Sequence, residues 1–362
     1  MLERYAYVGC RTTRERNARG EGISVFGVDV DGRWHLQGVE ATLPNPSYLA
    51  LRRDGRRLYT VHGDGSEITV FRVDGSTLSS LGSDTVAGLN PVDLLLSPDE
   101  RFLVATNHLT GALVTRAVDA DGCLGSLVSY LTIQETLGPH RTEQTSTKPH
   151  QARFSPCGRW LAVPNKGSDT VSAVAYDSET GQLSLRPEGT ARVREGSGPR
   201  NIVFSRLHEL AYLVGELDST VTVLSTAGAL LKPLRTHSTL PDDAFAQSRA
   251  AAVVLSPDGS TLFVSNRGHD TICAFEVDRE TGLLSTPRWS GCGGRTPRFA
   301  TAYPGGSGLV VANEDSDTIV ALGRDVTGET ILLANTPSPV CVVFGPSLAT
   351  DASGTRSDGG SP

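Results

Sequence analysis

The sequence predicts an all-β protein with the fold of a seven-bladed β-propeller, and three observations support that prediction. The 362-residue chain has 39 glycines and 20 prolines but only 6% aromatic residues. This composition is typical of many short strands joined by tight turns. Similar segments recur at intervals of roughly 40–50 residues, a period typical of propeller blades. Finally, the two ends of the chain are complementary parts of one further segment.

Each repeat has the pattern of a four-stranded blade. A strand leads through a turn of the Pro-Asp-Gly type into a second strand, then a polar corner, a third strand, and a Gly-containing turn into a short fourth strand. The segment "AAVVLSPDGSTLFVSNRGHDTICAFEVDRETGLL" shows every part of this pattern. Six such segments begin at Tyr48, Val92, Gln151, Asn201, Ala251 and Phe299.

The seventh blade is divided between the ends of the chain. The segment that starts "YAYVGC" has the second, third and fourth strands, and "SPVCVVFGP" resembles the missing first strand. Pairing residues 340–344 with residues 5–9 closes the ring and leaves no long strand edge unpaired. We therefore predict one domain over residues 1–345. The tail, residues 346–362, has almost nothing apolar to bury, so we expect it to be disordered.

Charge and composition also narrow the classes of partner. A net charge of -7 and a pI near 5.6 argue against binding to nucleic acid or to an anionic membrane surface. The N-terminal "MLERYAYVGC" lacks the apolar core of a signal peptide, and no apolar run approaches the ~18 residues of a membrane span. Six scattered cysteines without a C-x-x-C pair favour free thiols. We expect a cytoplasmic protein that is a monomer or a weak homodimer.

Polar residues of unusual type gather at one end of the predicted ring. In an antiparallel blade the first strand starts where the second strand stops, so the Xaa-Pro lead-ins of the first strands and the corners after the second strands share one face. The opposite face has only turn residues chosen for backbone geometry. Around the mouth of the channel the sequence places His150, Arg200 and Arg298 from lead-ins, and Asn107, Lys166, Glu216, Arg267 and His269 from corners.

This set of side chains favours acid-base chemistry on an anion. Arginines around one carboxylate and one imidazole form an electropositive pocket, and guanidinium groups suit carboxylate or phosphate oxygens. Histidines and carboxylates do not recur at metal-ligand spacing, and neither a G-x-S-x-G elbow nor a nucleotide-binding fingerprint is present. We therefore expect no metal and no cofactor. Lactone hydrolysis needs a base for water and a cation for the oxyanion, and lactone formation needs similar groups.

Structural roles also fit several of these residues. Arg267 can bond carbonyls of a neighbouring blade, and Glu216 can form an ion pair between blades. His150 can cap the central strand. His269 can anchor the start of the third strand, where other repeats have Ser-Asp or Asp-Ser.

Several segments resemble the seven-bladed propeller lactonase family, which includes bacterial 6-phosphogluconolactonases and the fungal 3-carboxy-cis,cis-muconate lactonizing enzyme. The similarity extends from Tyr5 to Phe344, and its most specific motifs are "SGPR", "ELDSTVTV" and "SNRGHD". It implies a metal-free site of one histidine, two arginines and one glutamate. These match His150, Arg200, Glu216 and Arg267.

The chain departs from the family pattern at two positions. Lys148 stands where many members have a first histidine, and Gly63 stands where a glutamate is usual. The loop "GPHRTEQTSTKPH" keeps a Gly-Pro start and is a candidate lid over the site. These departures bear mainly on which substrate is bound.

The resulting hypothesis is a metal-independent hydrolase of a small anionic lactone, 6-phosphogluconolactonase-like and so part of the pentose phosphate pathway. His150, Arg200, Glu216 and Arg267 are its catalytic residues, with either His150 or Glu216 activating water. Arg298, His269, Asn107 and Lys148 are expected to bind substrate. The alternatives are a carboxymuconate-type lactonizing enzyme and a non-catalytic propeller that serves as a binding platform.

Overall fold

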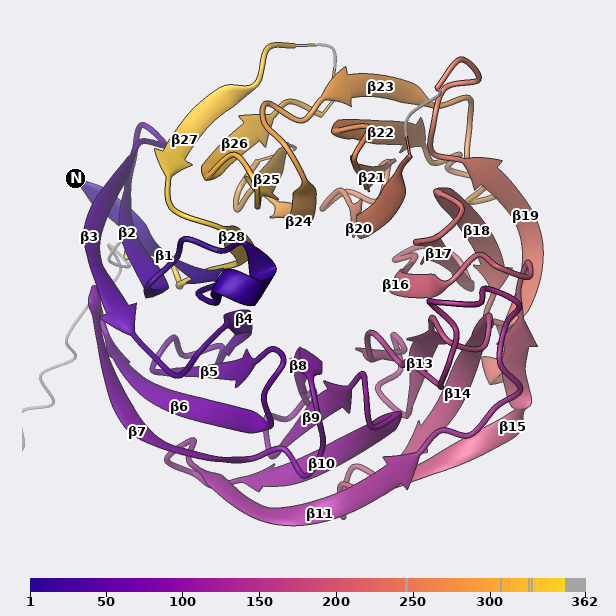
Figure 1. The fold of residues 1–362 in the computed structure, drawn as a ribbon, viewed down its shortest axis with the longest axis horizontal. Helices are drawn as coiled ribbons and strands as arrows, with labels where there is room; N and C mark the ends of the chain where they lie inside the picture. Colours follow the sequence, from indigo (N-terminus) through magenta and orange to yellow (C-terminus); the bar gives the residue numbers. More distant parts are fainter. Residues whose placement is uncertain (245–246, 307, 325, 327, 349–362) are drawn as a thin grey trace, which may run out of the picture.

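Seven four-stranded antiparallel sheets surround a central axis in the computed structural model (Figure 1). The structure describes residues 1–244, 247–306, 308–324, 326 and 328–348. The prediction of an all-β, seven-bladed propeller is therefore confirmed. In Figure 1 the fourth strands, such as β7, β11 and β19, form the outer rim, whereas β4, β8, β16, β20 and β24 lie nearest the centre.

The first four blades are numbered in chain order from the N-terminus. The strands of each blade are given from the innermost to the outermost. Blade 1 consists of β28 (Pro339–Phe344), β1 (Leu2–Cys10), β2 (Gly22–Asp29) and β3 (Trp34–Ala41). Blade 2 consists of β4 (Pro46–Leu51), β5 (Arg57–His62), β6 (Glu67–Asp74) and β7 (Thr77–Thr85). Blade 3 consists of β8 (Pro91–Leu96), β9 (Phe102–Asn107), β10 (Ala112–Val118) and β11 (Leu124–Thr132). Blade 4 consists of β12 (Arg153–Phe154), β13 (Trp160–Asn165), β14 (Thr170–Tyr176) and β15 (Leu183–Arg192).

The remaining three blades repeat this order. Blade 5 consists of β16 (Pro199–Phe204), β17 (Leu210–Gly215), β18 (Thr220–Ser225) and β19 (Lys232–Ser238). Blade 6 consists of β20 (Arg249–Leu255), β21 (Thr261–Arg267), β22 (Thr271–Glu276) and β23 (Arg288–Gly291). Blade 7 consists of β24 (Pro297–Ala302), β25 (Leu309–Asn313), β26 (Thr318–Leu322) and β27 (Ile331–Asn335). Two short 3-10 helices, η1 (Arg14–Arg16) and η2 (Ala227–Ala229), lie in connections.

The ring closes as the sequence predicts. β28 pairs antiparallel with β1, from Ala6 opposite Phe344 to Gly9 opposite Cys341. The backbone amide of Gly345 then donates to the carbonyl of Tyr5 at 2.8 Å, and residues up to 348 stay beside the N-terminal strand. The predicted disordered tail lies, from residue 349 onward, outside the described residues.

The core lies between neighbouring blades. The second strands β9, β13 and β17 are buried along their whole length, because a blade in a closed ring is covered on both faces. One cluster joins Tyr212 and Val214 of blade 5 to Leu262 and Val264 of blade 6. This packing holds the ends of the second strands in fixed positions around the mouth of the channel.

The six cysteines are free. No helix within the described ranges is long and apolar enough to cross a membrane.

Candidate active site

The first feature of the mouth is a set of seven equivalent positions. In each blade the last residue of the second strand, or the residue directly after it, is here called the corner residue, and it lies at the same end of the ring. In six blades its backbone amide donates to the carbonyl of the residue before the lead-in proline, as Glu216 does to Gly198 at 2.9 Å. In blade 6, Arg267 instead pairs with Arg249 of β20. Around the ring the corner residues are Arg11, Gly63, His108, Lys166, Glu216, Arg267 and Glu314.

The lead-ins themselves differ from the extended conformation that is usual for a residue before proline. The residue before the proline has a positive φ of 49–59° in five blades, at Asn45, Asn90, Gly198, Thr296 and Ser338. In each case the carbonyl of that residue accepts the corner amide at 2.9–3.0 Å. This hydrogen bond satisfies an amide that would otherwise be buried alone, which offsets the backbone strain.

A β-bulge after the lead-in proline turns the next side chain toward the channel. In blade 7, Pro297 pairs with Asn313 but Phe299 pairs with Ala312, so Arg298 is the extra residue. Blade 5 has the same irregularity, and it contains Arg200. Bulges of this kind re-aim side chains next to functional sites. In blade 4 the ladder is interrupted between Pro149 and β12, and His150 lies in that gap.

Glu216 is the centre of a buried ion network and is only 4% exposed. Four cationic groups surround its carboxylate. Their nitrogens are Lys166 Nζ at 2.8 Å and Arg249 Nη1 at 3.4 Å from Oε1, with Arg200 Nε at 3.1 Å and Arg267 Nη2 at 3.4 Å from Oε2. Burial alone would raise the pKa of Glu216, but Arg267, Lys166 and Arg200 outweigh it and hold the pKa well below the usual range. Glu216 is therefore a fixed negative charge, and it forms the predicted ion pair between blades.

His150 presents a neutral imidazole to the central cavity. Its Nδ1 is buried and has no hydrogen-bond partner among the described residues, which leaves Nε2 as the ring nitrogen open to the cavity. Burial, followed by the charge of Arg200, lowers the pKa of His150 well below 6.5. The ring packs edge to face against His108 at 5.3 Å, and burial lowers the pKa of His108 to about 4.

Arg200 is held firmly beside His150. Its Nη1 donates to Asn201 Oδ1 at 2.7 Å and to the carbonyl of Ala251, in the next blade, at 2.8 Å. Burial, followed by the charge of Arg267, lowers the pKa of Arg200 to about 9. Its remaining terminal nitrogen, Nη2, is the one left open to the cavity.

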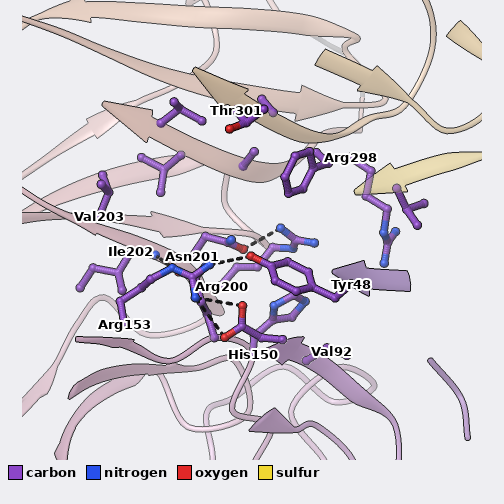
Figure 2. Close-up of a pocket in the computed structure, with 18 of the residues that line it drawn as sticks. Tyr48, Val92, His150, Arg153, Arg200, Asn201, Ile202, Val203, Arg298 and Thr301 are labelled. Atoms are coloured by element: carbon purple, nitrogen blue, oxygen red, sulfur yellow. Dashed lines mark hydrogen bonds and ion pairs between the residues drawn. The ribbon is translucent and has the colours of Figure 1, made fainter. Parts of the chain in front are cut away.

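A cavity of about 470 Å³ extends from this mouth into the channel. Figure 2 shows His150, Arg200, Arg298 and Tyr48 among the side chains that surround it. Its size lies within the range of about 300–1,000 Å³ that is common for small-molecule sites. The lining also contains apolar side chains, among them Phe204, Leu255 and Val340.

An ion cluster of Asp93, Arg153 and Tyr48 lines the channel beside His150. Arg153 Nη1 contacts both oxygens of the buried Asp93 carboxylate at 3.0 and 3.1 Å, and its Nη2 donates to the Tyr48 hydroxyl at 2.7 Å (Figure 2). The second oxygen of Asp93 also accepts the amide of Ala152 at 3.0 Å. These bonds join the innermost strands of blades 2, 3 and 4 and hold the backbone next to His150.

The loop that contains "GPHRTEQTSTKPH" reaches over Glu216. Glu143 of this loop contacts Lys166 Nζ at 2.9 Å and Arg249 Nη2 at 2.6 Å, so it shares both cations with Glu216. Burial opposes ionisation of Glu143, but Arg249 and Lys166 lower its pKa to about 2. Gln144 anchors the loop through bonds to the Lys166 carbonyl and to Asp169. The loop therefore joins the buried network around Glu216, and its role as a lid stays a prediction.

The structure brings together five of the eight residues that the sequence proposed: His150, Arg200, Glu216, Arg267 and Arg298. Lys148 lies close by, but its Nζ donates to the Glu143 carbonyl at 2.7 Å and so holds the loop. Asn107 is fully buried, and its Nδ2 donates to the Val86 carbonyl outside the cavity lining. His269 bonds Thr271 at 2.8 Å, which agrees with anchoring of the third strand.

Sequence reasoning missed Glu143, His108, Arg11 and Glu314 as members of this site, and it noted Lys166 without giving it a role. Three of the four missed residues are corner residues. Aligning the repeats on the position of Glu216 gives His108, rather than its neighbour Asn107, in blade 3. The same alignment gives Glu314 in blade 7 and Arg11 in blade 1. No comparable sequence signal marks Glu143.

Comparison with known proteins places this geometry in a family. Residues 5–344 match the family described as lactonase, 7-bladed beta-propeller. The chain belongs to this lactonase family. The matches support a lactone-hydrolysing enzyme, which agrees with a neutral imidazole and guanidinium groups around one cavity.

Relatives of this lactonase are similar along nearly the whole chain. A 6-phosphogluconolactonase of Bacillus subtilis is 30% identical over 358 residues, which cover 95% of this chain and 99% of that protein. A 6-phosphogluconolactonase of Formosa agariphila is 28% identical over 338 residues, covering 89% and 93%. The solved structure of a Pseudomonas aeruginosa periplasmic gluconolactonase has a TM-score of 0.84 and 30% identity, and covers 94% of this chain and 99% of that one.

Proposed function

We propose that this lactonase hydrolyses 6-phospho-D-glucono-1,5-lactone to 6-phosphogluconate, without a metal ion. The observation that carries the proposal is the neutral His150 imidazole, open to a cavity beside the Arg200 guanidinium, while Glu216 is fixed among cations. The names of the two bacterial 6-phosphogluconolactonases support the choice of substrate. This reaction belongs to the pentose phosphate pathway.

His150 is the better proton acceptor of the two candidates. Glu216 is engaged by four cations and its pKa is held low, so it has little tendency to take a proton. The depressed pKa of His150 keeps its imidazole unprotonated throughout the neutral range. A general base must be in its free form and within reach of water in the site.

Arg200 supplies the positive charge for the developing oxyanion. Its guanidinium is anchored through Nη1 and keeps Nη2 for the substrate, so little reorganisation is needed during reaction. Arg267 lies behind Glu216, and the two together maintain the orientation of Arg200. Glu216 therefore acts as a positioning residue in this proposal.

The reaction balances as addition of one water molecule. His150 takes a proton from water, and the hydroxide attacks the lactone carbonyl carbon to form a tetrahedral oxyanion beside Arg200. Collapse of the oxyanion breaks the bond to the ring oxygen, which receives the proton from His150. The products are a hydroxyl group and a carboxylic acid that ionises at neutral pH.

The donor set argues for catalysis without a metal ion, because guanidinium and ammonium groups repel cations and supply no ligand. Across the described part of the chain, no group of three or more His, Cys, Asp or Glu side chains is placed to hold a metal ion.

The test is hydrolysis by chelator-treated protein of freshly generated 6-phosphogluconolactone, with gluconolactone and a carboxylated muconolactone as comparisons. We expect His150→Asn to lower kcat on the phosphorylated lactone by about 10²-fold or more relative to wild type. His35→Asn, at a partly exposed position on β3, is the matched control. If only the muconolactone reacts, the protein is a carboxymuconate-type enzyme. If no lactone reacts above the spontaneous rate, the proposal is wrong and a binding role remains.

A further inference from the structure

The mouth of the cavity contains a second cluster built like the one around Glu216. Glu314 occupies the corner position of blade 7 that Glu216 occupies in blade 5, and Arg298 occupies the bulge position of Arg200. Arg11, the corner residue of blade 1, stands in the position that Arg267 has relative to Glu216. Each carboxylate thus lies between a bulge arginine of its own blade and a corner arginine of the next blade.

The contacts in this second cluster leave positive charge unsatisfied. Arg11 Nε lies 3.0 Å from Glu314 Oε1, and Arg298 Nη1 lies 3.3 Å from Glu314 Oε2, so two guanidinium groups share one carboxylate. The nearest other acid is Asp64, 3.7 Å from Arg11 Nη1, but Arg16 bonds both oxygens of Asp64. Because Arg16 neutralises Asp64, Arg11 and Arg298 share only the single negative charge of Glu314. The two arginines therefore keep a net positive charge.

Arg11 is poised as a ligand-binding side chain. It is only 7% exposed, yet it lines the cavity together with Arg298. Its Nε and Nη1 are buried without an aligned hydrogen-bond acceptor among the described residues, and its Nη2 is the nitrogen left open to the cavity. Arg298 pairs with Glu314. Buried donors without acceptors are uncommon because they cost free energy, and Nη2 is the nitrogen through which a ligand in the cavity can bind Arg11.

Both clusters contribute arginines to the wall of one cavity, Arg200 from the first and Arg11 and Arg298 from the second, and their charges interact. Arg298 contributes to the lowered pKa of Arg200 and of Arg267, after burial and the nearer charges. A ligand with a single anionic centre needs only one of these clusters. The duplicated arrangement fits a ligand with a reacting carbonyl at one end and a permanent anion at the other.

We propose that Arg11 and Arg298 form a second anion-binding subsite, which takes the phosphate monoester of a lactone whose ring carbonyl faces His150 and Arg200. This inference rests on the proposed function and adds the residues that select a phosphorylated over an unphosphorylated lactone. A phosphate monoester carries close to two negative charges at pH 7 and has three acceptor oxygens. Two guanidinium groups suit it better than they suit one hydroxyl group.

The test uses equilibrium binding of reaction products, because binding can be measured whether or not hydrolysis occurs. Titration calorimetry compares 6-phosphogluconate, gluconate and glucarate, which carry at carbon 6 a phosphate, a hydroxyl and a carboxylate. We expect wild type to prefer 6-phosphogluconate over gluconate, and Arg11→Gln to weaken 6-phosphogluconate binding about tenfold to a hundredfold. Arg11→Lys should keep part of that affinity. A stronger preference for glucarate than for 6-phosphogluconate would overturn the assignment to a phosphate.

The control is Arg19→Gln, which removes the same charge from an exposed position in the same loop, where the guanidinium pairs with Asp317. Thermal unfolding of each variant shows whether the fold is kept. Equal losses of 6-phosphogluconate and gluconate affinity in Arg11→Gln would overturn the proposed subsite. Equal affinity of the wild type for 6-phosphogluconate and gluconate would also overturn it. With active enzyme, Arg11→Gln should raise KM for the phosphorylated lactone more than it lowers kcat.

These outcomes are separable from failure of the proposed function. If no lactone is hydrolysed but the preference for phosphate depends on Arg11, the subsite stands and the hydrolase proposal falls. If 6-phosphogluconolactone and gluconolactone are hydrolysed with equal kcat/KM, the hydrolase proposal stands for an unphosphorylated substrate and the proposal of a phosphate subsite is wrong.

Discussion

Lys166 Nζ lies 2.8 Å from Glu216 Oε1, and both side chains are buried where blades 4 and 5 meet. Removing one member of a buried pair leaves an unpaired charge, which usually costs about 3–5 kcal/mol. Here the Glu216 carboxylate pairs with three arginines as well as with Lys166. The stability of the fold therefore depends on Glu216 more than on any single cation. The network that orients Arg200 therefore also stabilises the ring.

The lowered pKa of Glu216 predicts how stability changes with pH. A carboxyl group whose pKa is lower in the folded than in the unfolded state stabilises the fold above the unfolded pKa, and this contribution is lost as pH falls toward the folded pKa. We expect Glu216→Gln to reduce the free energy of unfolding by about 3 kcal/mol at pH 7. That difference from wild type should shrink by about 1.4 kcal/mol for each pH unit below about 4.

Urea unfolding at pH 7 and at pH 3 measures this difference. The matched control is Glu188→Gln, which neutralises an exposed carboxylate on β15 that pairs with Arg186 of the same strand. It should change stability by less than about 0.5 kcal/mol at either pH. A Glu216→Gln deficit that is the same at both pH values would contradict an ionised, ion-paired Glu216.

The lowered pKa of His150 predicts the pH dependence of activity. If neutral His150 is the base, kcat/KM stays level as pH falls through 6.5 and decreases only well below that value. An unperturbed histidine would instead lose half of its activity near pH 6.5. The measurement is kcat/KM between pH 4.5 and 8 with the spontaneous rate subtracted. A decline centred at or above pH 6.5 would assign the limiting ionisation to another group.

The fold was predictable because each repeat contains the same local sequence signals for its strands and turns. The turns after the first strands, the prolines of the lead-ins and the alternating apolar residues recur six times, so one blade predicts the others. The sequence "SPVCVVFGP" predicted closure by β28 because it lacks the strands that follow it in every complete repeat.

The core of the site was predictable for a different reason. Glu216 directly follows β17, Arg267 ends β21, and Arg200 follows a lead-in proline, so topology alone brings them to one face. Which ions pair was not predictable, because Glu143 and Arg249 are 106 positions apart in the sequence and meet only through the loop over the mouth. The choice of Asn107 rather than His108 failed by one residue, because Asn107 bonds the Val86 carbonyl whereas His108 packs against His150.

Ring closure makes a further prediction about stability. Val342 of β28 is almost fully buried between blades 1 and 7, against Ala6 and Val8. Val342→Ala removes two buried methyl groups at about 0.8 kcal/mol each and leaves a small cavity, so we expect a loss of about 2 kcal/mol. Val39→Ala, on the exposed face of β3 in the same blade, should cost less than about 0.5 kcal/mol. Equal shifts in the urea midpoint would show that β28 does not complete the core.

The loop over Glu216 is held by charges at its centre, and this predicts a separable effect on dynamics. Glu143→Gln weakens the contacts to Lys166 and Arg249 but leaves the Gln144 anchor in place. We therefore expect faster amide hydrogen exchange in residues 134–148, and unchanged exchange in β13 and β17, because the blade core is not involved.

Closure of this loop over a bound lactone would exclude water and strengthen the electrostatic interactions within the site. Glu143→Gln should accordingly raise KM several-fold and lower kcat less. The exposed control Glu188→Gln should alter neither the exchange nor KM, since the Glu188 carboxylate pairs with Arg186 on β15 and not with the loop. If Glu143→Gln leaves exchange in the loop unchanged, the Glu143 ion pairs do not hold the loop, and the bonds of Gln144 and Lys148 are its anchors. If exchange rises while KM stays constant, the loop moves independently of substrate binding and is not a lid.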